Sequence, residues 1–190
     1  MSYKPLLMVD IDGVISLFGF PSEDRPEGSF HSIDGIFHFL SSNAAAHLLA
    51  LAANFNLVWC SGWEEKANEY LPHLLGLPDA LPFLSFARAP GKANAHWKLE
   101  AIDDYAGSRP LAWIDDAFNG ACHEWAAARA TPTLLVQTDP AIGLTSKEAE
   151  LLSAWAPEHS LTPWPGSGHP GAMTIREKLY TRRHAAKRAS

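Results

Sequence analysis

The stretch Leu6-Leu7-Met8-Val9-Asp10-Ile11-Asp12-Gly13 decides the fold of this 190-residue chain. Four apolar residues are followed directly by two aspartates that flank an isoleucine, and then by a glycine. A short continuous apolar run is typical of a strand buried on both faces, as in a parallel sheet covered by helices. Ligands of open α/β sheets bind beyond the carboxyl ends of the strands, so we expect Asp10 and Asp12 to face a ligand. Gly13 would let the chain leave the strand close to that ligand.

Similar apolar runs recur along the chain and alternate with helix-like segments. The runs cover residues 57–60, 83–86, 111–114 and 133–136, and the helical patterns cover 41–53, 64–75, 97–105, 117–129 and 145–155. The last helix begins with Thr145 and has Glu148 three residues on, which predicts a capping box. This alternation predicts a three-layer α/β/α, Rossmann-like domain with a central, mainly parallel, five-stranded sheet.

Two segments rich in proline and glycine interrupt the alternation. Residues 16–35 are expected to form a loop or a small hairpin beside the first strand. Residues 157–171 are expected to form a linker, and residues 172–187 a further helix. We therefore expect one domain over residues 1–156, followed by a linker and a basic helix or tail over 157–190.

Charge is distributed unevenly along the chain. The net charge is −6, yet residues 176–190 hold six basic residues and only Glu177 as an acid, so the rest of the chain carries −11. Such a basic tail can contact a polyanion such as nucleic acid, although a solvated terminal helix is the simpler explanation. The chain has two cysteines without zinc-ligand spacing, and its apolar start is too short for a secretion signal. No run approaches the roughly 20 apolar residues of a membrane span, so we expect a cytoplasmic protein.

Three further pieces of sequence suit phosphate chemistry. Asp115-Asp116 ends an apolar run, and adjacent carboxylates repel each other unless a cation such as Mg²⁺ lies between them. Helix N-cap acids are the alternative explanation for this pair. Ser61-Gly62 ends another run and offers a hydroxyl and backbone N–H groups to a phosphate oxygen, or simply an N-cap. Lys98, at a helix start, could neutralise a carboxylate and a phosphoryl group, with Lys92 as its competitor.

The order of these pieces resembles the haloacid dehalogenase (HAD) superfamily, chiefly phosphatases and phosphotransferases. An Asp–x–Asp–Gly signature after a strand, a serine after the second strand, a helix-start lysine and an acidic pair match Asp10 to Gly13, Ser61, Lys98 and Asp115-Asp116. An EF-hand calcium loop is excluded, because Val14, Ile15 and Pro21 replace the residues that it requires. The strings Cys60-Ser61-Gly62-Trp63, His96-Trp97-Lys98 and Trp113-Ile114-Asp115-Asp116 resemble most the HAD domains of Swiss Army Knife RNA repair proteins.

The resemblance implies a role for each residue of the set. Asp10 would be the nucleophile that forms an aspartyl-phosphate, and Asp12 the general acid and base. Mg²⁺ would be held by the Asp10 carboxylate, the Asp12 backbone carbonyl and Asp115, with Asp116 in support. Ser61, Gly62 and Lys98 would bind the phosphate, and we consider Arg25, in the 16–35 loop, a further contact.

The gaps between the motifs bear on the substrate. About 47 residues separate Gly13 from Ser61 and about 35 separate Gly62 from Lys98, so neither gap holds a large cap domain. We expect an open site acting as a phosphomonoesterase on a phosphorylated substrate such as a nucleotide or a nucleic-acid end. The alternative is a non-catalytic HAD-like module that binds nucleic acid or a repair partner.

Trp63 and Trp97 lie near the motifs and could stack on a base or sugar, although core packing explains them more simply. His96 is more simply a surface residue, and Asp139 could line the pocket or equally well be a turn acid before Pro140.

Overall fold

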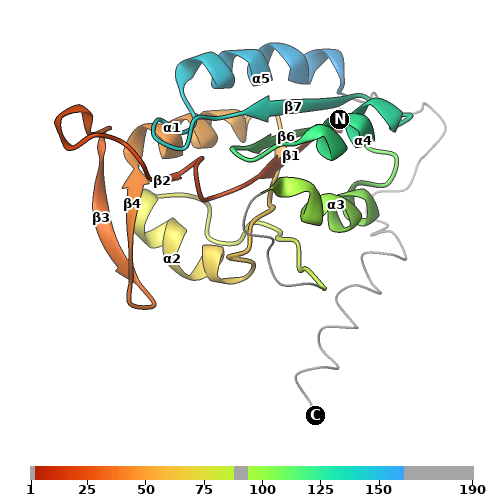
Figure 1. Cartoon of the computed structure of the whole chain (residues 1–190). Helices are drawn as coiled ribbons and strands as arrows, with labels where there is room; N and C mark the ends of the chain where they lie inside the picture. Colours follow the sequence, from red (N-terminus) through yellow and green to blue (C-terminus); the bar gives the residue numbers. More distant parts are fainter. Residues whose placement is uncertain (1–2, 88–93, 161–190) are drawn as a thin grey trace. The chain divides into compact units, whose positions relative to one another are not determined.

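A computed structural model describes residues 3–87 and 94–160 of the chain. Its main sheet contains four parallel strands in the order β5-β1-β6-β7 (Figure 1). The strands are β1 Leu6–Val9, β5 Asn56–Trp59, β6 Leu111–Asp115 and β7 Thr133–Gln137. The α/β fold predicted from the sequence is therefore present, with four parallel strands in the sheet and not five.

The difference in strand number concerns residues 83–86. Only Phe83 pairs with the sheet, through an isolated parallel bridge to Trp59. The backbone of Trp59 donates to the Pro82 carbonyl (2.8 Å) and accepts from Leu84 (2.9 Å), so the segment touches β5 over one residue. Pro82 has no N–H to extend this ladder before Phe83, and β5 ends at Trp59, so residues 84–86 have no paired residue on that strand.

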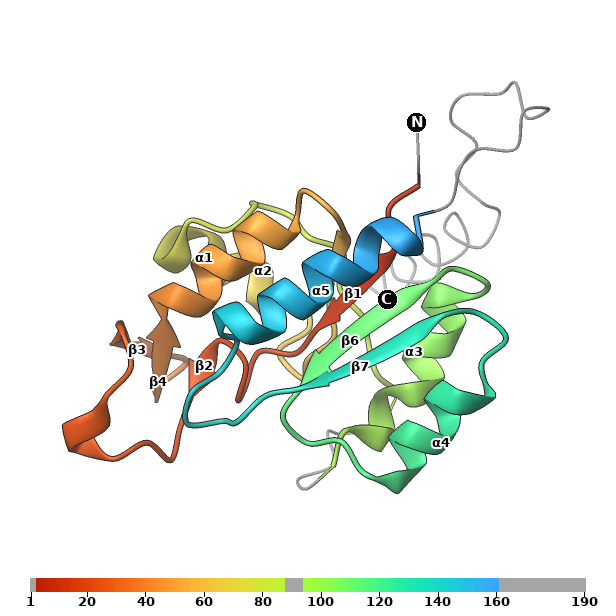
Figure 2. The same ribbon diagram turned by 90° about the horizontal axis from the view of Figure 1, so that it is seen from above.

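Helices cover both faces of the main sheet. Along β1, Leu7 and Val9 face one apolar cluster, whereas Leu6 and Met8 face the other, as the alternation of a strand requires. The first cluster includes buried residues of α1 Ser42–Leu51, α2 Lys66–Leu75 and α5 Ser146–Glu158. The second includes those of α3 Leu99–Ala106 and α4 Gly120–Ala128. Figure 2 shows α1 and α5 side by side over the sheet, which gives the expected three layers.

The helix boundaries follow local capping signals. The Ser41 side chain accepts a hydrogen bond from the backbone of Ala44 at the start of α1. Gly76 ends α2 with φ of 66°, a conformation that favours glycine. The predicted capping box of Thr145 and Glu148 is present at the start of α5. The helix expected over residues 97–105 is present as α3, and its first turn is replaced by a 3₁₀ turn, η2 Ala95–Lys98.

A second, antiparallel sheet lies beside the first and realises the hairpin alternative for residues 16–35. Its strands run in the order β2-β4-β3, with bounds β2 Ser16–Leu17, β3 Gly28–Ile33 and β4 Ile36–Ser41. A 3₁₀ turn, η1 Ser22–Asp24, lies between β2 and β3. The turn between β3 and β4 contains Asp34 and Gly35, both with positive φ. Asp34 accepts hydrogen bonds from Lys66 and Tyr70, so side chains of α2 hold this turn.

Within the described ranges, no helix combines the length and the apolar character needed to cross a bilayer. The helix expected over residues 172–187 lies outside the described residues, as does most of the linker.

Candidate active site

Carboxylates from two neighbouring strands meet at the carboxyl end of the main sheet. Asp10 follows β1 and Asp115 ends β6, and the parallel register pairs Val9 with Ile114 just before them. Asp116 comes next in the chain, and carboxylate oxygens of all three residues lie within 4.8 Å of one another. The backbone N–H of Ile11 donates to Asp10 Oδ1 (2.8 Å), and that of Ala117 donates to Asp115 Oδ1 (3.0 Å). The orientation of these two carboxylates is thus fixed by the backbone that follows each strand.

Lys98 forms ion pairs with two of the three carboxylates. Its Nζ lies 2.8 Å from Asp10 Oδ2 and 2.6 Å from Asp115 Oδ2, and its side chain is 4% exposed. Burial alone would lower the pKa of Lys98, but the two carboxylates outweigh it and raise that pKa above the ordinary value. The ammonium therefore stays charged. Lys98 lies at the junction of η2 and α3, and its ammonium reaches the carboxyl end of the main sheet. Its competitor Lys92 lies outside the described residues.

The acidic cluster is electrostatically unfavourable without a further cation. Burial and the nearby charge of Asp10 raise the pKa of Asp115 to about 6. The same two causes raise the pKa of Asp116 above its ordinary value. Three converging carboxylates supply the hard oxygen ligands that Mg²⁺ prefers, and a divalent cation would relieve their repulsion. The residues present therefore fit a magnesium ion.

Gly13 makes room for Asp116. Its φ is +74°, and a Cβ atom built on it would lie 2.4 Å from Cγ of Asp116. Thr138 supports the same region, because its hydroxyl donates to the Gly13 carbonyl (2.9 Å) and its N–H donates to the Asp115 carbonyl (3.2 Å). Glycine is required here by both the backbone conformation and the close approach of a carboxylate.

Asp12 takes a different direction from the other three aspartates. The indole Nε1 of Trp63 donates to Asp12 Oδ2 (3.0 Å), and His38 Nδ1 lies 3.9 Å from Asp12 Oδ1. Burial and the charge of Asp10 raise the pKa of Asp12, while hydrogen bonds from Trp63 and Ser16 and the nearby His38 oppose the rise. The pKa of Asp12 is raised overall, so Asp12 is protonated more readily than an isolated aspartate. A raised pKa suits a proton donor.

The remaining phosphate-binding candidates differ in their surroundings. Ser61 is buried one residue after Cys60, whose N–H donates to the Val9 carbonyl (2.7 Å), so Ser61 lies at the same sheet edge as Asp10. Gly62 is exposed in the turn that follows. Arg25 is exposed just after η1, and no hydrogen bond or ion pair within the described ranges joins it to the carboxylates.

Residues 6–149 match the family described as the HAD domain in Swiss Army Knife RNA repair proteins. The chain belongs to this family of HAD domains. Neither the search of curated proteins nor the search of solved structures gave a match. Membership supports a phosphatase-like hydrolase linked to RNA repair, and it is consistent with the acidic cluster at the ends of β1 and β6.

The structure of this HAD domain adds residues that the sequence did not single out. His38 reaches Asp12 from β4, whereas His96, the histidine nearest the motifs in sequence, is exposed and bonds to Asn119. Ser16 and Thr138 also contact the motif that follows β1. Only knowledge of the β2–β4 pairing could have brought His38, 26 residues from Asp12 in sequence, to the site. Trp63, for which core packing was the simpler explanation, does pack against the first apolar cluster, and its indole also donates to Asp12.

A cleft of about 660 Å³ adjoins the cluster at the end of β7. Asp116, Gln137, Asp139 and Thr145 are among the residues that line it. Asp139 therefore lines this cleft, and it also accepts a hydrogen bond from the backbone of Ala141 (2.9 Å), as a turn acid before Pro140 would. The cleft gives a substrate bound at the carboxylates room to extend towards α5.

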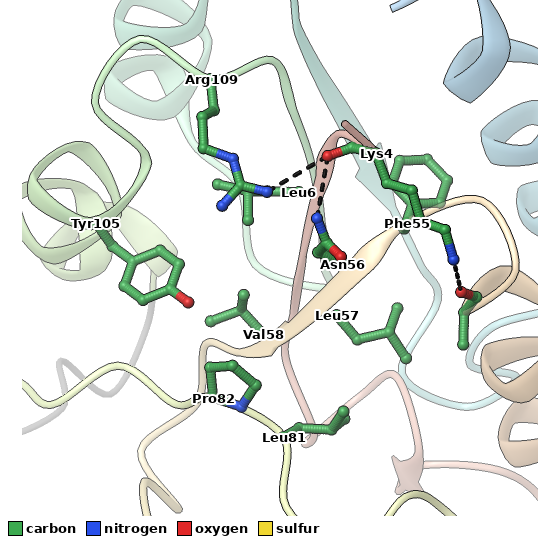
Figure 3. A pocket seen from close by; sticks show the side chains of 11 residues that line it. Lys4, Leu6, Phe55, Asn56, Leu57, Val58, Leu81, Pro82, Tyr105 and Arg109 are labelled. Carbon is green, nitrogen blue, oxygen red and sulfur yellow. Dashed lines mark hydrogen bonds between the residues drawn. The ribbon is translucent and has the colours of Figure 1, made fainter. Parts of the chain in front are cut away.

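Another pocket, of about 370 Å³, lies at the opposite, amino end of the strands (Figure 3). Its polar side chains are engaged with the backbone. Arg109 and Asn56 donate to the Lys4 carbonyl (3.3 and 3.2 Å), and Lys4 Nζ donates to the Ala52 carbonyl (2.9 Å). These contacts join the start of β1 to its neighbours, so we interpret this pocket as structural.

Proposed function

We propose that the protein is a magnesium-dependent phosphomonoester hydrolase that acts through an aspartyl-phosphate on Asp10. The observation that carries the proposal is the cluster of Asp10, Asp115 and Asp116 with the buried Lys98 between two of them. A carboxylate nucleophile and a dianionic phosphate repel each other unless nearby cations neutralise both groups. Lys98 and Mg²⁺ would supply that positive charge. Mg²⁺ would be held by the Asp10 carboxylate, the Asp12 backbone carbonyl and Asp115, with Asp116 in support.

Asp10 and Asp12, the two carboxylates of the first motif, have different roles in the proposed reaction. Asp10 attacks phosphorus, the bond to the leaving oxygen breaks, and protonated Asp12 gives its proton to that oxygen. Asp12 then takes a proton from water, whose oxygen attacks the phosphorus of the aspartyl-phosphate and releases inorganic phosphate. Ser61, the Gly62 backbone and Lys98 hold the phosphoryl oxygens in both steps. Arg25 would have to reach the substrate from the protein surface.

The substrate class follows from access and family. We propose a phosphorylated nucleotide or nucleic-acid end, because the family is named for RNA repair and the described residues show a small hairpin beside the site instead of a cap domain. We further propose that residues 1–156 form the catalytic domain and that the basic residues of 157–190 contact nucleic acid, in a cytoplasmic setting. Such phosphate contacts are independent of sequence and weaken with salt.

The test is hydrolysis of a broad panel of phosphomonoesters with and without Mg²⁺, comparing wild type with Asp10→Asn. Activity that requires both Mg²⁺ and Asp10 supports the proposal. Wild type and Asp10→Asn that are equally inactive across the panel would favour the non-catalytic alternative. Lys98→Met should abolish turnover and Lys92→Met should not, and the opposite result would assign the site lysine to Lys92. Deletion of residues 172–190 should lower RNA affinity at low salt, and unchanged affinity would remove the tail from the proposal.

A further inference from the structure

The side chain of Asp12 has a set of contacts of its own. The carboxylates that converge within 4.8 Å are those of Asp10, Asp115 and Asp116, and Asp12 is not among them. Its carboxyl group accepts from Trp63 Nε1 (3.0 Å) and lies 3.9 Å from His38 Nδ1, and the Asp12 backbone forms an isolated bridge with Ser16. Three residues therefore surround a carboxyl group that is half-exposed.

These three side chains come from separate segments and contact one another. The Ser16 hydroxyl lies 3.0 Å from His38 Nδ1, and the rings of His38 and Trp63 meet edge to face with their centroids 4.7 Å apart. Trp63 lies in the turn after β5, Ser16 begins β2, and His38 lies on β4. These contacts restrict the rotamer of His38, which touches both Ser16 and Trp63, and the hydrogen bond from Trp63 restricts that of Asp12.

The antiparallel sheet fixes the positions of Ser16 and His38. β4 pairs with both β2 and β3, and the turn between β3 and β4 is held to α2 through Asp34, Lys66 and Tyr70. Asp12 itself forms an isolated bridge with Ser16. The position of the hairpin therefore determines where His38 and Ser16 lie relative to the Asp12 carboxyl group.

We propose that Trp63 and His38 are positioning residues that hold the Asp12 carboxyl group towards the leaving oxygen of the substrate, with Ser16 joining His38 to Asp12. The proposal rests on the proposed phosphatase function, in which Asp12 donates a proton. General acid catalysis depends on the placement of the proton, and a misplacement of about 1 Å costs on the order of 10²-fold in rate. The hairpin then contributes to catalysis by fixing an acid, in addition to bordering the site.

The leaving group provides a readout that separates positioning from a general structural role. A nitrophenolate leaves without being protonated, whereas the alkoxide of a nucleoside phosphate needs a proton in the transition state. In Trp63→Phe and His38→Leu we expect kcat/KM for a nucleoside monophosphate, which reports the steps up to formation of the aspartyl-phosphate, to fall about 10- to 100-fold. We expect kcat/KM for p-nitrophenyl phosphate to stay within about 3-fold of wild type, because formation of the aspartyl-phosphate from this substrate does not need the acid. Asp12→Asn should show the same pattern more strongly, and His38→Asn, which keeps a polar atom near the position of Nδ1, should recover part of the loss.

Matched controls exist on neighbouring elements and away from the site. His31→Leu changes the cross-strand neighbour of His38, and Trp125→Phe changes a tryptophan whose ring contacts are with Trp113 and Arg129. Both should leave the ratio of the two substrates unchanged. Thermal unfolding and Mg²⁺ affinity of each variant are measured in parallel, and both should match wild type for Trp63→Phe. If that variant does not fold, Ser16→Ala, which removes only a hydroxyl, takes its place.

Two results are decisive in different ways. If wild type hydrolyses both substrates and the Trp63 and His38 variants lose both equally, or lose neither, the positioning proposal is wrong while the phosphatase stands. If wild type hydrolyses neither substrate with Mg²⁺ present, the proposed function fails and the role of Trp63 and His38 fails with it.

Discussion

Gly13→Ala tests how closely the chain packs against the acidic cluster. Alanine at φ of +74° pays the left-handed penalty of roughly 1–2 kcal/mol, and its Cβ would lie 2.4 Å from Cγ of Asp116. The Asp116 side chain must therefore rotate, which adds about 0.5–1.5 kcal/mol for an off-rotamer position. We expect Gly13→Ala to lower the free energy of unfolding by about 1.5–3.5 kcal/mol and to weaken Mg²⁺ binding, because Asp116 leaves the cluster.

Gly19→Ala provides a matched control. Gly19 has φ of +81°, close to that of Gly13, but nothing lies within 4 Å of the Cβ that alanine would add. Gly19→Ala should therefore lower the free energy of unfolding only by the backbone penalty of about 1–2 kcal/mol and leave Mg²⁺ affinity unchanged. Urea unfolding without metal gives the stabilities, and isothermal titration gives the affinities. Equal stability losses and equal Mg²⁺ affinities in the two variants would refute the view that Gly13 is required by Asp116.

Three further perturbations follow from the same contacts. Lys98→Met leaves the carboxylates of Asp10 and Asp115 buried without their partner, so the free energy of unfolding of the metal-free protein should fall by about 3–5 kcal/mol. Mg²⁺ should stabilise this variant more than wild type, as thermal unfolding would show. The pKa of Asp115, raised to about 6, lies above its ordinary value, so the metal-free free energy of unfolding should decline as pH rises from about 4 to about 6. Saturating Mg²⁺ should abolish that decline in urea titrations, and a decline of equal size with Mg²⁺ would contradict the cluster as its cause. Thr145→Ala breaks the capping box with Glu148 and should cost about 1 kcal/mol in urea unfolding without altering Mg²⁺ affinity.

The layout of the site could be predicted because it depends on local signals. Each carboxylate directly follows an apolar run, and the carboxyl ends of parallel neighbours meet at one edge of a sheet. The run before Asp10 and the run before Asp115 therefore placed both residues without knowledge of any long-range contact. Lys98 was favoured over Lys92 from its position at a helix start, and the structure places its ammonium between Asp10 and Asp115.

The surroundings of Asp12 depend on pairings that no local signal gives. His38 reaches Asp12 because β4 pairs with β2 in the register that sets Ser16 opposite Leu40. A change of one residue in that register would turn His38 to the other face of the hairpin. The fifth strand, by contrast, was expected from a local signal alone, and that signal was not sufficient. Residues 83–86 are apolar, as a buried strand requires, yet apolar character alone does not supply the ladder hydrogen bonds beyond Phe83.

The charges of the site constrain the order in which ligands can bind. Three converging carboxylates and one ammonium leave two negative charges at the sheet edge, if all four groups are ionised. A phosphomonoester dianion that approached this site without metal would meet net repulsion, strengthened by the low dielectric around buried groups. In the proposed reaction a divalent cation would cancel the excess negative charge, and Lys98 would remain available to both Asp10 and the phosphoryl group. Phosphate should therefore bind with or after the metal. The buried Lys98 is what keeps a cluster of three carboxylates compatible with folding before either arrives.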